Sequence, residues 1–335
     1  MGSLMRLLAV STLLFVPPTS GRAIEFVPHE GAVVRKTFTS ELDLSSDSVD
    51  FYFEDERLDE DEIGEVELLV TFRREVSVLD TQERVRDGRL ARWSRVIETA
   101  QETTEESFAV GDQEGRLEYE RGSDYTDLPI QCRWDEDEEP EGVDEYGDSV
   151  DAAAELELAG LVPDGDVEEG DTWTPAATAL SPLFRQAGEH WSEEFEIEGD
   201  EDLPAETPLL FARLFGELPE GELEAEWTET LERGGERLAL IELSAELTLE
   251  HYDYEEAEGG GEDSIDLTLE LELEGTVLWS LDRGGLVELE LEGDAELTME
   301  AESILESEGR DFSMSQRVRY SGDVSFTAMH ERAED

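Results

Sequence analysis

The sequence predicts a mainly β protein, in which long antiparallel strands form one or two curved sheets, arranged as an open barrel or a sandwich, with a few short helices. The first observation is the alternation of leucine and glutamate over residues 265–301, which a turn at residues 282–285 divides in two. Side chains of a strand point alternately to opposite faces, so a period of two indicates a half-buried strand. In a helix the same leucines would spread around the whole circumference. We therefore expect a long hairpin with one apolar and one acidic face.

The second observation is the position of two glycines, Gly275 and Gly293, near the middles of these expected strands. A glycine inside a strand weakens it and often marks a bend. Leucine and glutamate prefer helices intrinsically, but only by roughly tenths of a kcal/mol per residue. Burial of a complete apolar row outweighs that preference. The glycines therefore favour a curved sheet or a partly closed barrel over a flat sandwich.

Shorter stretches of the same alternation predict the remaining strands. They are residues 66–78, 89–99, 117–121, 222–227, 238–249 and 318–328. The dipeptide Asp87-Gly88 is a strong hairpin turn signal between the first two. Within residues 238–249 the apolar parity changes at Leu240 and Ile241, which predicts a β-bulge there.

The middle of the chain departs from the strand pattern. Residues 135–148 are an acidic run with proline and glycine, which predicts a solvated loop. Residues 149–158 are rich in alanine, glutamate and leucine and are followed by Gly160, so we expect a short helix. A second short helix is expected at residues 209–215, because Pro208 stands where a first helical position would lie.

Residues 1–23 are expected to be a signal peptide. Arg6 supplies a positive charge, residues 7–16 are apolar, and small residues precede an expected cut before Ile24. An apolar run of this length is too short to span a bilayer, and no other stretch predicts a transmembrane segment. We expect an exported protein, either periplasmic or extracellular.

We expect two domains in the mature chain. Residues 24–175 form an N-terminal antiparallel β domain with the acidic loop and a short helix, and residues 176–335 form a C-terminal antiparallel β domain. The only cysteine, Cys132, excludes an internal disulfide. We interpret it as a small apolar side chain in the core rather than a nucleophile.

The net charge of -67 limits the classes of partner. It results from 91 acidic residues against 24 basic ones, and Lys36 is the single lysine. Such a surface repels phosphate, so we expect no nucleic acid partner. A solvating surface suited to a salty medium explains the charge most simply, and weak binding of divalent cations or of basic proteins is the alternative. Carboxylates that oppose each other on a sheet destabilise it, so we expect stability to rise with added salt.

The most motif-like segment is a turn of four residues, which we expect to be structural. They are Gly170, Asp171, Thr172 and Trp173, preceded by Leu161, Val162 and Pro163. Gly170 permits a tight turn, Asp171 can cap neighbouring amides, and Trp173 offers an apolar anchor. The segment resembles one shared by a family of uncharacterised exported β-rich proteins (a domain of unknown function). In these proteins a later strand carries glycine, an aromatic residue and a turn glycine, to which Gly275, Trp279 and Gly284 are similar. The resemblance implies a β fold and export, without a known activity.

Catalytic and metal-binding patterns are weak, and we expect neither a catalytic site nor a cofactor. The pattern at Asp164, Asp166 and Glu168 lacks the glycine and the final glutamate of an EF-hand loop, and Asp59 with Asp61 fails in the same way. The four histidines are scattered, and neither a His-Glu-x-x-His pair nor a Gly-x-Ser-x-Gly turn occurs.

Three functional hypotheses remain. The first is a non-enzymatic structural or binding module of the cell envelope or extracellular space. The second is a carrier of lipid or another hydrophobic ligand in an open β-barrel, and the third is a hydrolase of an extracellular polymer that uses paired carboxylates. The concave face of the sheet would discriminate them, because paired catalytic carboxyls lie about 5–9.5 Å apart in a cleft. An apolar cavity would favour carriage, and a filled core would favour a structural module.

Overall fold

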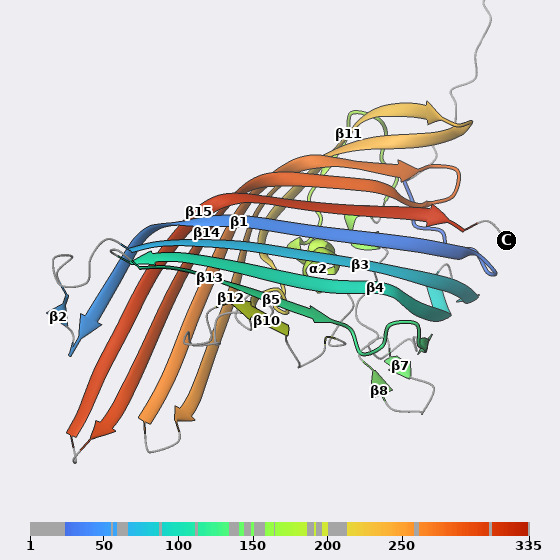
Figure 1. Ribbon diagram of the computed structural model, residues 1–335. Helices are drawn as coiled ribbons and strands as arrows, with labels where there is room; N and C mark the ends of the chain where they lie inside the picture. Colours follow the sequence, from blue (N-terminus) through green and yellow to red (C-terminus); the bar gives the residue numbers. More distant parts are fainter. Residues whose placement is uncertain are drawn as a thin grey trace, which may run out of the picture.

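A computed structural model of the chain shows one open antiparallel sheet (Figure 1). The structure describes residues 24–54, 56–58, 66–86, 89–110, 113–133, 141–143, 149–150, 158–163, 165–185, 191, 196–199, 213–257, 261–307 and 310–333. The prediction of a mainly β fold with long antiparallel strands is confirmed, and of the predicted alternatives the single open sheet excludes a sandwich. The expected signal peptide, residues 1–23, and the Asp87-Gly88 turn lie outside the described residues.

The strands of the first half are β1 (Val33–Phe53), β2 (Glu56–Arg57), β3 (Val66–Arg86), β4 (Arg89–Val110), β5 (Gln113–Gly122), β6 (Pro129–Arg133), β7 (Glu141–Val143), β8 (Ser149–Val150), β9 (Thr172–Trp173) and β10 (Glu196–Gly199). The strands of the second half are β11 (Glu220–Arg233), β12 (Glu236–Ala257), β13 (Gly261–Ser280), β14 (Gly285–Ser307) and β15 (Arg310–Arg332). The short helices are η1 (Ala159–Leu161), η2 (Ala177–Leu180) and α2 (Ser181–Phe184).

The strands of both halves of the chain belong to one continuous hydrogen-bonded sheet. Its main path runs β8-β7-β6-β4-β3-β1-β15-β14-β13-β12-β11-β9, and β5 with β10 branches from β4. The first long strand, β1, therefore pairs with the last, β15, from Val34 opposite Arg332 to Phe53 opposite Met314. Both of the segments that the sequence separates as domains contribute strands to this one sheet.

We call the two surfaces of the sheet the core face and the acidic face. On β13 the core face carries leucines such as Leu269 and Leu271, which are buried, and the acidic face carries glutamates such as Glu270 and Glu272, which are exposed. Residues opposite each other on adjacent strands share a face, so the two faces can be followed from strand to strand across the sheet. The predicted hairpin with one apolar and one acidic surface is confirmed.

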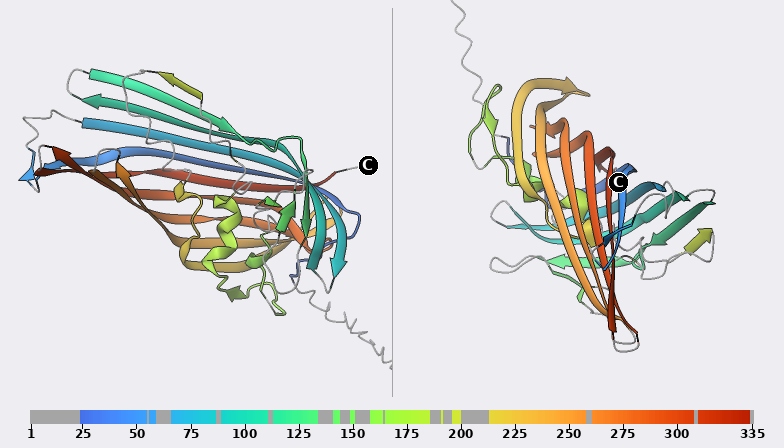
Figure 2. Two further views of the ribbon diagram at one scale, coloured as in Figure 1. Left: turned by 90° about the horizontal axis from the view of Figure 1, so that it is seen from below. Right: turned by 90° about the vertical axis from the view of Figure 1, so that its left-hand side faces the viewer.

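The core face is covered by the segment that contains η1, η2 and α2 (Figure 2). Phe184 of α2 lies edge-on to Phe326 of β15 at 5.0 Å between ring centroids. Phe215 stacks on Phe72 of β3 at 4.8 Å and lies 5.9 Å from Phe184. These rings join strands from both halves of the chain into one hydrophobic core.

Gly275 and Gly293 allow neighbouring strands to approach closely. A Cβ atom at Gly275 would lie 2.0 Å from the carbonyl oxygen of Glu290, and one at Gly293 would lie 1.8 Å from that of Glu272. Gly275 pairs with Leu291, two residues before Gly293, so the glycines follow a diagonal across the sheet. Figure 1 shows β13, β14 and β15 curving along their length. The expectation of a curved sheet is confirmed.

Three local predictions need correction. The bulge opposite Leu240 and Ile241 is in the neighbouring strand: Trp227 pairs with Ile241 and Glu229 with Leu240, so the extra residue is Thr228. A parity change in one strand reports a bulge without saying which strand holds the extra residue.

The predicted helix at residues 149–158 starts as strand β8, Ser149–Val150, and its remaining residues up to 157 lie outside the described part. The predicted acidic loop contains β7, Glu141–Val143, which pairs with β6. In both places pairing with a neighbouring strand overrides local propensity. Of the helix expected at residues 209–215, the described residues Arg213 and Leu214 are helical.

Residues 24–32, which we call the N-terminal strap, cross the end of the sheet before β1 begins. Val27 donates its amide to the carbonyl of Gly284 at 2.7 Å, and Trp279 donates its indole N–H to the carbonyl of Glu25 at 3.2 Å. Gly284 has a φ of 67°, and a Cβ there would lie 2.6 Å from the Val27 side chain. Trp279 and Gly284, two of the three residues that resemble the later strand of the exported β-rich family, thus hold the strap.

Candidate functional site

The acidic face carries a transverse row of carboxylates that lie directly opposite each other on adjacent strands. We call this set the carboxylate row. From β11 through β12, β13, β14 and β15 to β1 its members are Glu222, Glu246, Glu272, Asp294, Asp323 and Asp43. All six side chains are exposed. Adjacent strands lie about 4.8 Å apart, so neighbours in the row repel by roughly 0.5–1 kcal/mol at low ionic strength.

No member of the carboxylate row makes an ion pair within the described part of the chain. By contrast, some carboxylates outside the row are paired, as Asp282 is with Arg237 at 2.6 Å and Glu105 with Arg116 at 2.6 Å. Two hollows of about 760 and 540 Å³ lie beside the row and share Glu274. The residues lining them include no basic side chain among those described. The face is thus suited to cations and unsuited to anions.

The Gly170–Trp173 turn lies at the edge of the sheet, against β11. Gly170 has a φ of 95° and donates its amide to the carbonyl of Trp227 at 2.7 Å. The Asp171 carboxylate accepts the amide of Glu168 at 2.8 Å. Thr172 and Trp173 form β9 against β11, and the Trp173 indole donates to the carbonyl of Leu161 at 2.9 Å. The four residues therefore attach the covering segment to the edge of the sheet. Thr172 also lines the larger hollow.

The core face contains a buried ionic group that the sequence analysis did not identify. The Asp80 carboxylate accepts hydrogen bonds from the Nζ of Lys36 at 2.7 Å and from the Nε of Arg95 at 2.8 Å. All three residues are buried. Burial alone would raise the pKa of Asp80, but the charges and hydrogen bonds of Arg95 and Lys36 outweigh it and hold that pKa well below its usual range.

A second ionic group joins the sheet to its covering segment. Arg74 of β3 and Arg121 of β5 both bind Glu102 of β4, with Arg121 Nε at 2.7 Å. The Nη1 of Arg74 also donates to the carbonyl of Phe184 at 2.7 Å, at the end of α2. Burial lowers the pKa of Arg74 despite the opposing effect of Glu102. The guanidinium lies 5.1 Å from the ring centroid of Trp191.

These groups bear on the hydrolase hypothesis. Each of the two carboxylates, Asp80 and Glu102, is bound by two cationic side chains. The lowered pKa of Asp80 keeps its carboxylate ionised, so Asp80 is poorly suited to donate a proton to a leaving group. Cys132, which lies near Asp80 and Arg95, is buried, and burial raises the pKa of its thiol to about 12. The interpretation of Cys132 as a buried apolar side chain is supported.

The sequence suggests scattered histidines, but two of them, His29 and His330, line one pocket, while His251 lies elsewhere. The Nδ1 of His251 lies 2.9 Å from the Glu217 carboxylate, His330 lies edge-on to Phe38 at 5.9 Å, and His190 is outside the described residues. Among the calcium candidates, Asp166 and Glu168 are exposed, while Asp59, Asp61 and Asp164 are not described. In the described residues, no group of three or more His, Cys, Asp or Glu could hold a metal ion.

The chain matches no protein family model, no curated protein and no solved structure. Over the described ranges, none of the helices has the length and apolar character required to cross a membrane.

Proposed function

We propose that this protein is an exported, non-enzymatic binding module of the cell envelope or extracellular space, and that the acidic face of its sheet binds a cationic partner. The observation that carries the proposal is the carboxylate row, in which six exposed carboxylates oppose each other without an ion pair in the described chain. A basic protein or polymer would replace several repulsions with attractions at once.

The arrangement of the row favours an extended partner. Neighbouring members are separated by about 4.8 Å across the strands. A flexible basic chain laid across the strands would meet successive carboxylates and the hollows beside them. Since these interactions lie at the surface, they weaken steeply with ionic strength.

The test is the binding of a 20-residue lysine peptide to the full chain at several NaCl concentrations, measured by calorimetry. We expect saturable binding. The logarithm of the association constant should fall linearly with the logarithm of the salt concentration. The variant Glu246→Gln, Glu272→Gln, Asp294→Asn, Asp323→Asn should bind at least tenfold more weakly.

The matched control removes the same charge elsewhere, with Glu75→Gln, Glu114→Gln, Glu120→Gln and Asp124→Asn, all exposed and outside the row. We expect it to retain most of the affinity. An equal loss in both variants would mean that only overall charge matters, and absence of binding at 150 mM salt would favour a purely solvating surface.

A second candidate function is carriage of a hydrophobic ligand, which one specific observation favours. At the far ends of β1 and β15 the core face carries Phe53 and Met314, which oppose each other and are 41% and 49% exposed. Phe312 stacks on Phe53 at 6.4 Å. The open sheet thus presents apolar side chains to solvent beyond the covered region. Organic extraction of the purified protein should then release lipid, and Met314→Glu should reduce the amount retained; an extract free of lipid would remove this candidate.

Export is tested by mass spectrometry of the protein recovered outside the cytoplasm. We expect the mature chain to begin at Ile24. Recovery of the chain with residues 1–23 intact in the cytoplasm would contradict export.

A further inference from the structure

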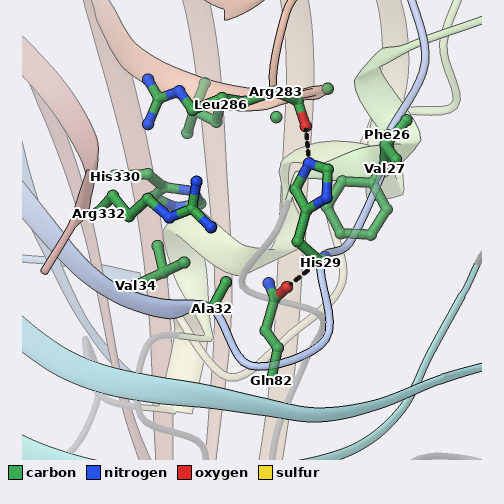
Figure 3. Close-up of a pocket in the computed structure, with 12 residues that line it drawn as sticks. Phe26, Val27, His29, Ala32, Val34, Gln82, Arg283, Leu286, His330 and Arg332 are labelled. Atoms are coloured by element: carbon green, nitrogen blue, oxygen red, sulfur yellow. Dashed lines mark hydrogen bonds between the residues drawn. The ribbon is translucent and has the colours of Figure 1, made fainter. Parts of the chain in front are cut away.

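A small pocket of about 60 Å³ lies where the N-terminal strap meets the ends of β3 and β15 (Figure 3). Its lining residues are Phe26, Val27, His29, Ala32, Val34, Gln82, Arg283, Gly284, Gly285, Leu286, His330 and Arg332. Two arginines and two histidines are among them, and none of these described lining residues is acidic. In a chain with 91 acidic and 24 basic residues, this composition is the reverse of the acidic face.

Gln82 supplies a fixed hydrogen-bond donor to the pocket. Its side-chain oxygen accepts the backbone amide of His29 at 2.7 Å. Because an amide N–H can only donate, this bond fixes which end of the Gln82 side chain is oxygen, so the NH₂ end points the other way. Gln82 is buried, and its backbone bonds to Gly31 and Ala32 hold it to the strap. Figure 3 shows the nitrogen of this amide facing the pocket.

Arg332 supplies a charge on the opposite side. It stands next to His330 at the end of β15, and Figure 3 shows both side chains across the pocket from His29. No carboxylate in the described chain forms an ion pair with Arg332. Arg283, by contrast, is paired with Glu236. A guanidinium presents planar N–H donors that match the oxygens of a carboxylate or phosphate group.

His29 completes the wall from the strap side. Its Nε2 lies 2.9 Å from the carbonyl oxygen of Arg283. A carbonyl oxygen only accepts, so Nε2 carries the hydrogen, and the ring is held by the turn between β13 and β14. The walls of the pocket are therefore fixed by the strap, by β3, by β15 and by this turn.

We infer that this pocket binds a small oxyanion, a carboxylate or phosphate group, through the Gln82 amide and the Arg332 guanidinium. The volume of about 60 Å³ exceeds the roughly 10–15 Å³ that one water requires, and it accommodates a group of a few heavy atoms. The bound anion bridges Gln82, which holds the strap, and β15. Since it binds only the folded chain, it stabilises the protein by mass action.

The experiment titrates inorganic phosphate, and separately acetate, into the full chain at constant ionic strength with sodium chloride as reference. Constant ionic strength is needed because the acidic face responds to salt in general. We expect saturable heat of binding and a rise in melting temperature with at least one of the two anions. Binding of phosphate alone identifies a phosphate group as the ligand, and binding of acetate identifies a carboxylate.

Two substitutions locate the site. Arg332→Gln should raise the dissociation constant at least tenfold. Gln82→Glu, which keeps the oxygen that accepts from His29 and replaces the donor by a second oxygen, should abolish binding. Arg319→Gln is the matched control: Arg319 is an exposed arginine of the same strand that lies outside the pocket, and its replacement should leave the dissociation constant unchanged.

Three results would overturn the inference: no saturable binding of either anion to the native chain, equal stabilisation by chloride, or equal affinity in Arg332→Gln and Arg319→Gln. Far-ultraviolet circular dichroism of each variant establishes that it is folded. Arg332→Lys, which keeps the charge but loses the planar donors, provides a further variant and should weaken binding about threefold to tenfold.

Discussion

The core face differs between the two sides of the sheet. On β13 and β14 its buried side chains are leucine, valine, alanine and tryptophan. On β1, β3 and β4 the same face carries Lys36, Arg74, Asp80, Arg95 and Glu102 among its apolar residues. A leucine can pack against another leucine two residues further along, whereas the Lys36–Asp80–Arg95 group forms in one register only. We conclude that apolar burial holds one side together, while buried ion pairs also fix the alignment of the other.

The sharpest way to break this comparison is a pair of size-conserving substitutions. Asp80→Asn leaves Lys36 and Arg95 buried without their carboxylate and should lower the free energy of unfolding by about 3–5 kcal/mol. Leu271→Met, on the apolar side, should cost less than about 1.5 kcal/mol. Urea denaturation of both variants measures the difference. Equal costs would show that the two sides do not differ in this respect.

The bend of the apolar side can be tested at its glycines. In Gly293→Ala the new Cβ would meet the carbonyl oxygen of Glu272, so the backbone must shift at a cost of roughly 1–3 kcal/mol. Gly285→Ala is the control, because nothing lies within 4 Å of a Cβ there. Its effect should stay within about 0.5 kcal/mol. Thermal unfolding of the two variants would show whether the close approach of the strands at Gly293 makes a Cβ atom there destabilising.

The stability of the chain should depend on salt through the carboxylate row. Glu272→Gln, Asp294→Asn, Asp323→Asn removes four adjacent repulsions in the carboxylate row and should raise stability by about 1–3 kcal/mol at low ionic strength. In 1 M NaCl the advantage should shrink, because repulsion is screened within about 3 Å. A melting temperature of the native chain that stays flat from low to molar salt would contradict this expectation.

Low pH should reduce the difference in the free energy of unfolding between the native chain and the Asp80→Asn variant. The pKa of Asp80 is lower in the folded chain than in the unfolded one. Its contribution to stability is therefore present above the unfolded pKa of about 3.9 and is lost as pH falls through the folded pKa. Because both proteins share the acidic face, comparing them cancels its response to acid. If the difference in the free energy of unfolding stayed constant from pH 7 to pH 2, the lowered pKa of Asp80 would be refuted.

The smallest expected effect concerns Cys132, which borders the ionic group. The pKa of its thiol is raised to about 12 by burial. The stability that the neutral thiol contributes is present below the unfolded pKa of about 8.5 and is lost as pH rises towards the folded value. At pH 8 labelling by iodoacetamide should be at least about a hundredfold slower in the native chain than in urea. Similar labelling rates would mean that the site opens readily.

The sequence was sufficient to predict the apolar side and insufficient for the ionic side, for a physical reason. An uninterrupted period of two identifies strands such as β13 without further information. Arg74 lies on the same parity as Phe72 and Val76, but pattern alone does not show that a charged residue is buried, because its partner Glu102 lies on another strand. Asp80 falls between the predicted strands at residues 66–78 and 89–99, so the sequence analysis did not place it on a strand. The one hint in the sequence was that Lys36 is the single lysine. Its burial could be recognised only once the register of β1 was known.

The predicted motif was informative about attachment rather than chemistry. Trp173 and Trp279 both anchor segments outside the long strands through their indole N–H groups. The pocket at Gln82 and Arg332 was not predictable, because it brings together residues near both ends of the chain.

The pairing of β1 with β15 has a consequence for how this chain reaches its native state. The two strands at the centre of the sheet are separated by nearly the whole length of the polypeptide. Their ladder cannot form until the last strand has left the ribosome, and until then β1 and β14 each expose an unpaired edge open to aggregation. Folding dominated by such distant contacts is slow. The strongly negative charge of the nascent chain opposes self-association during this delay.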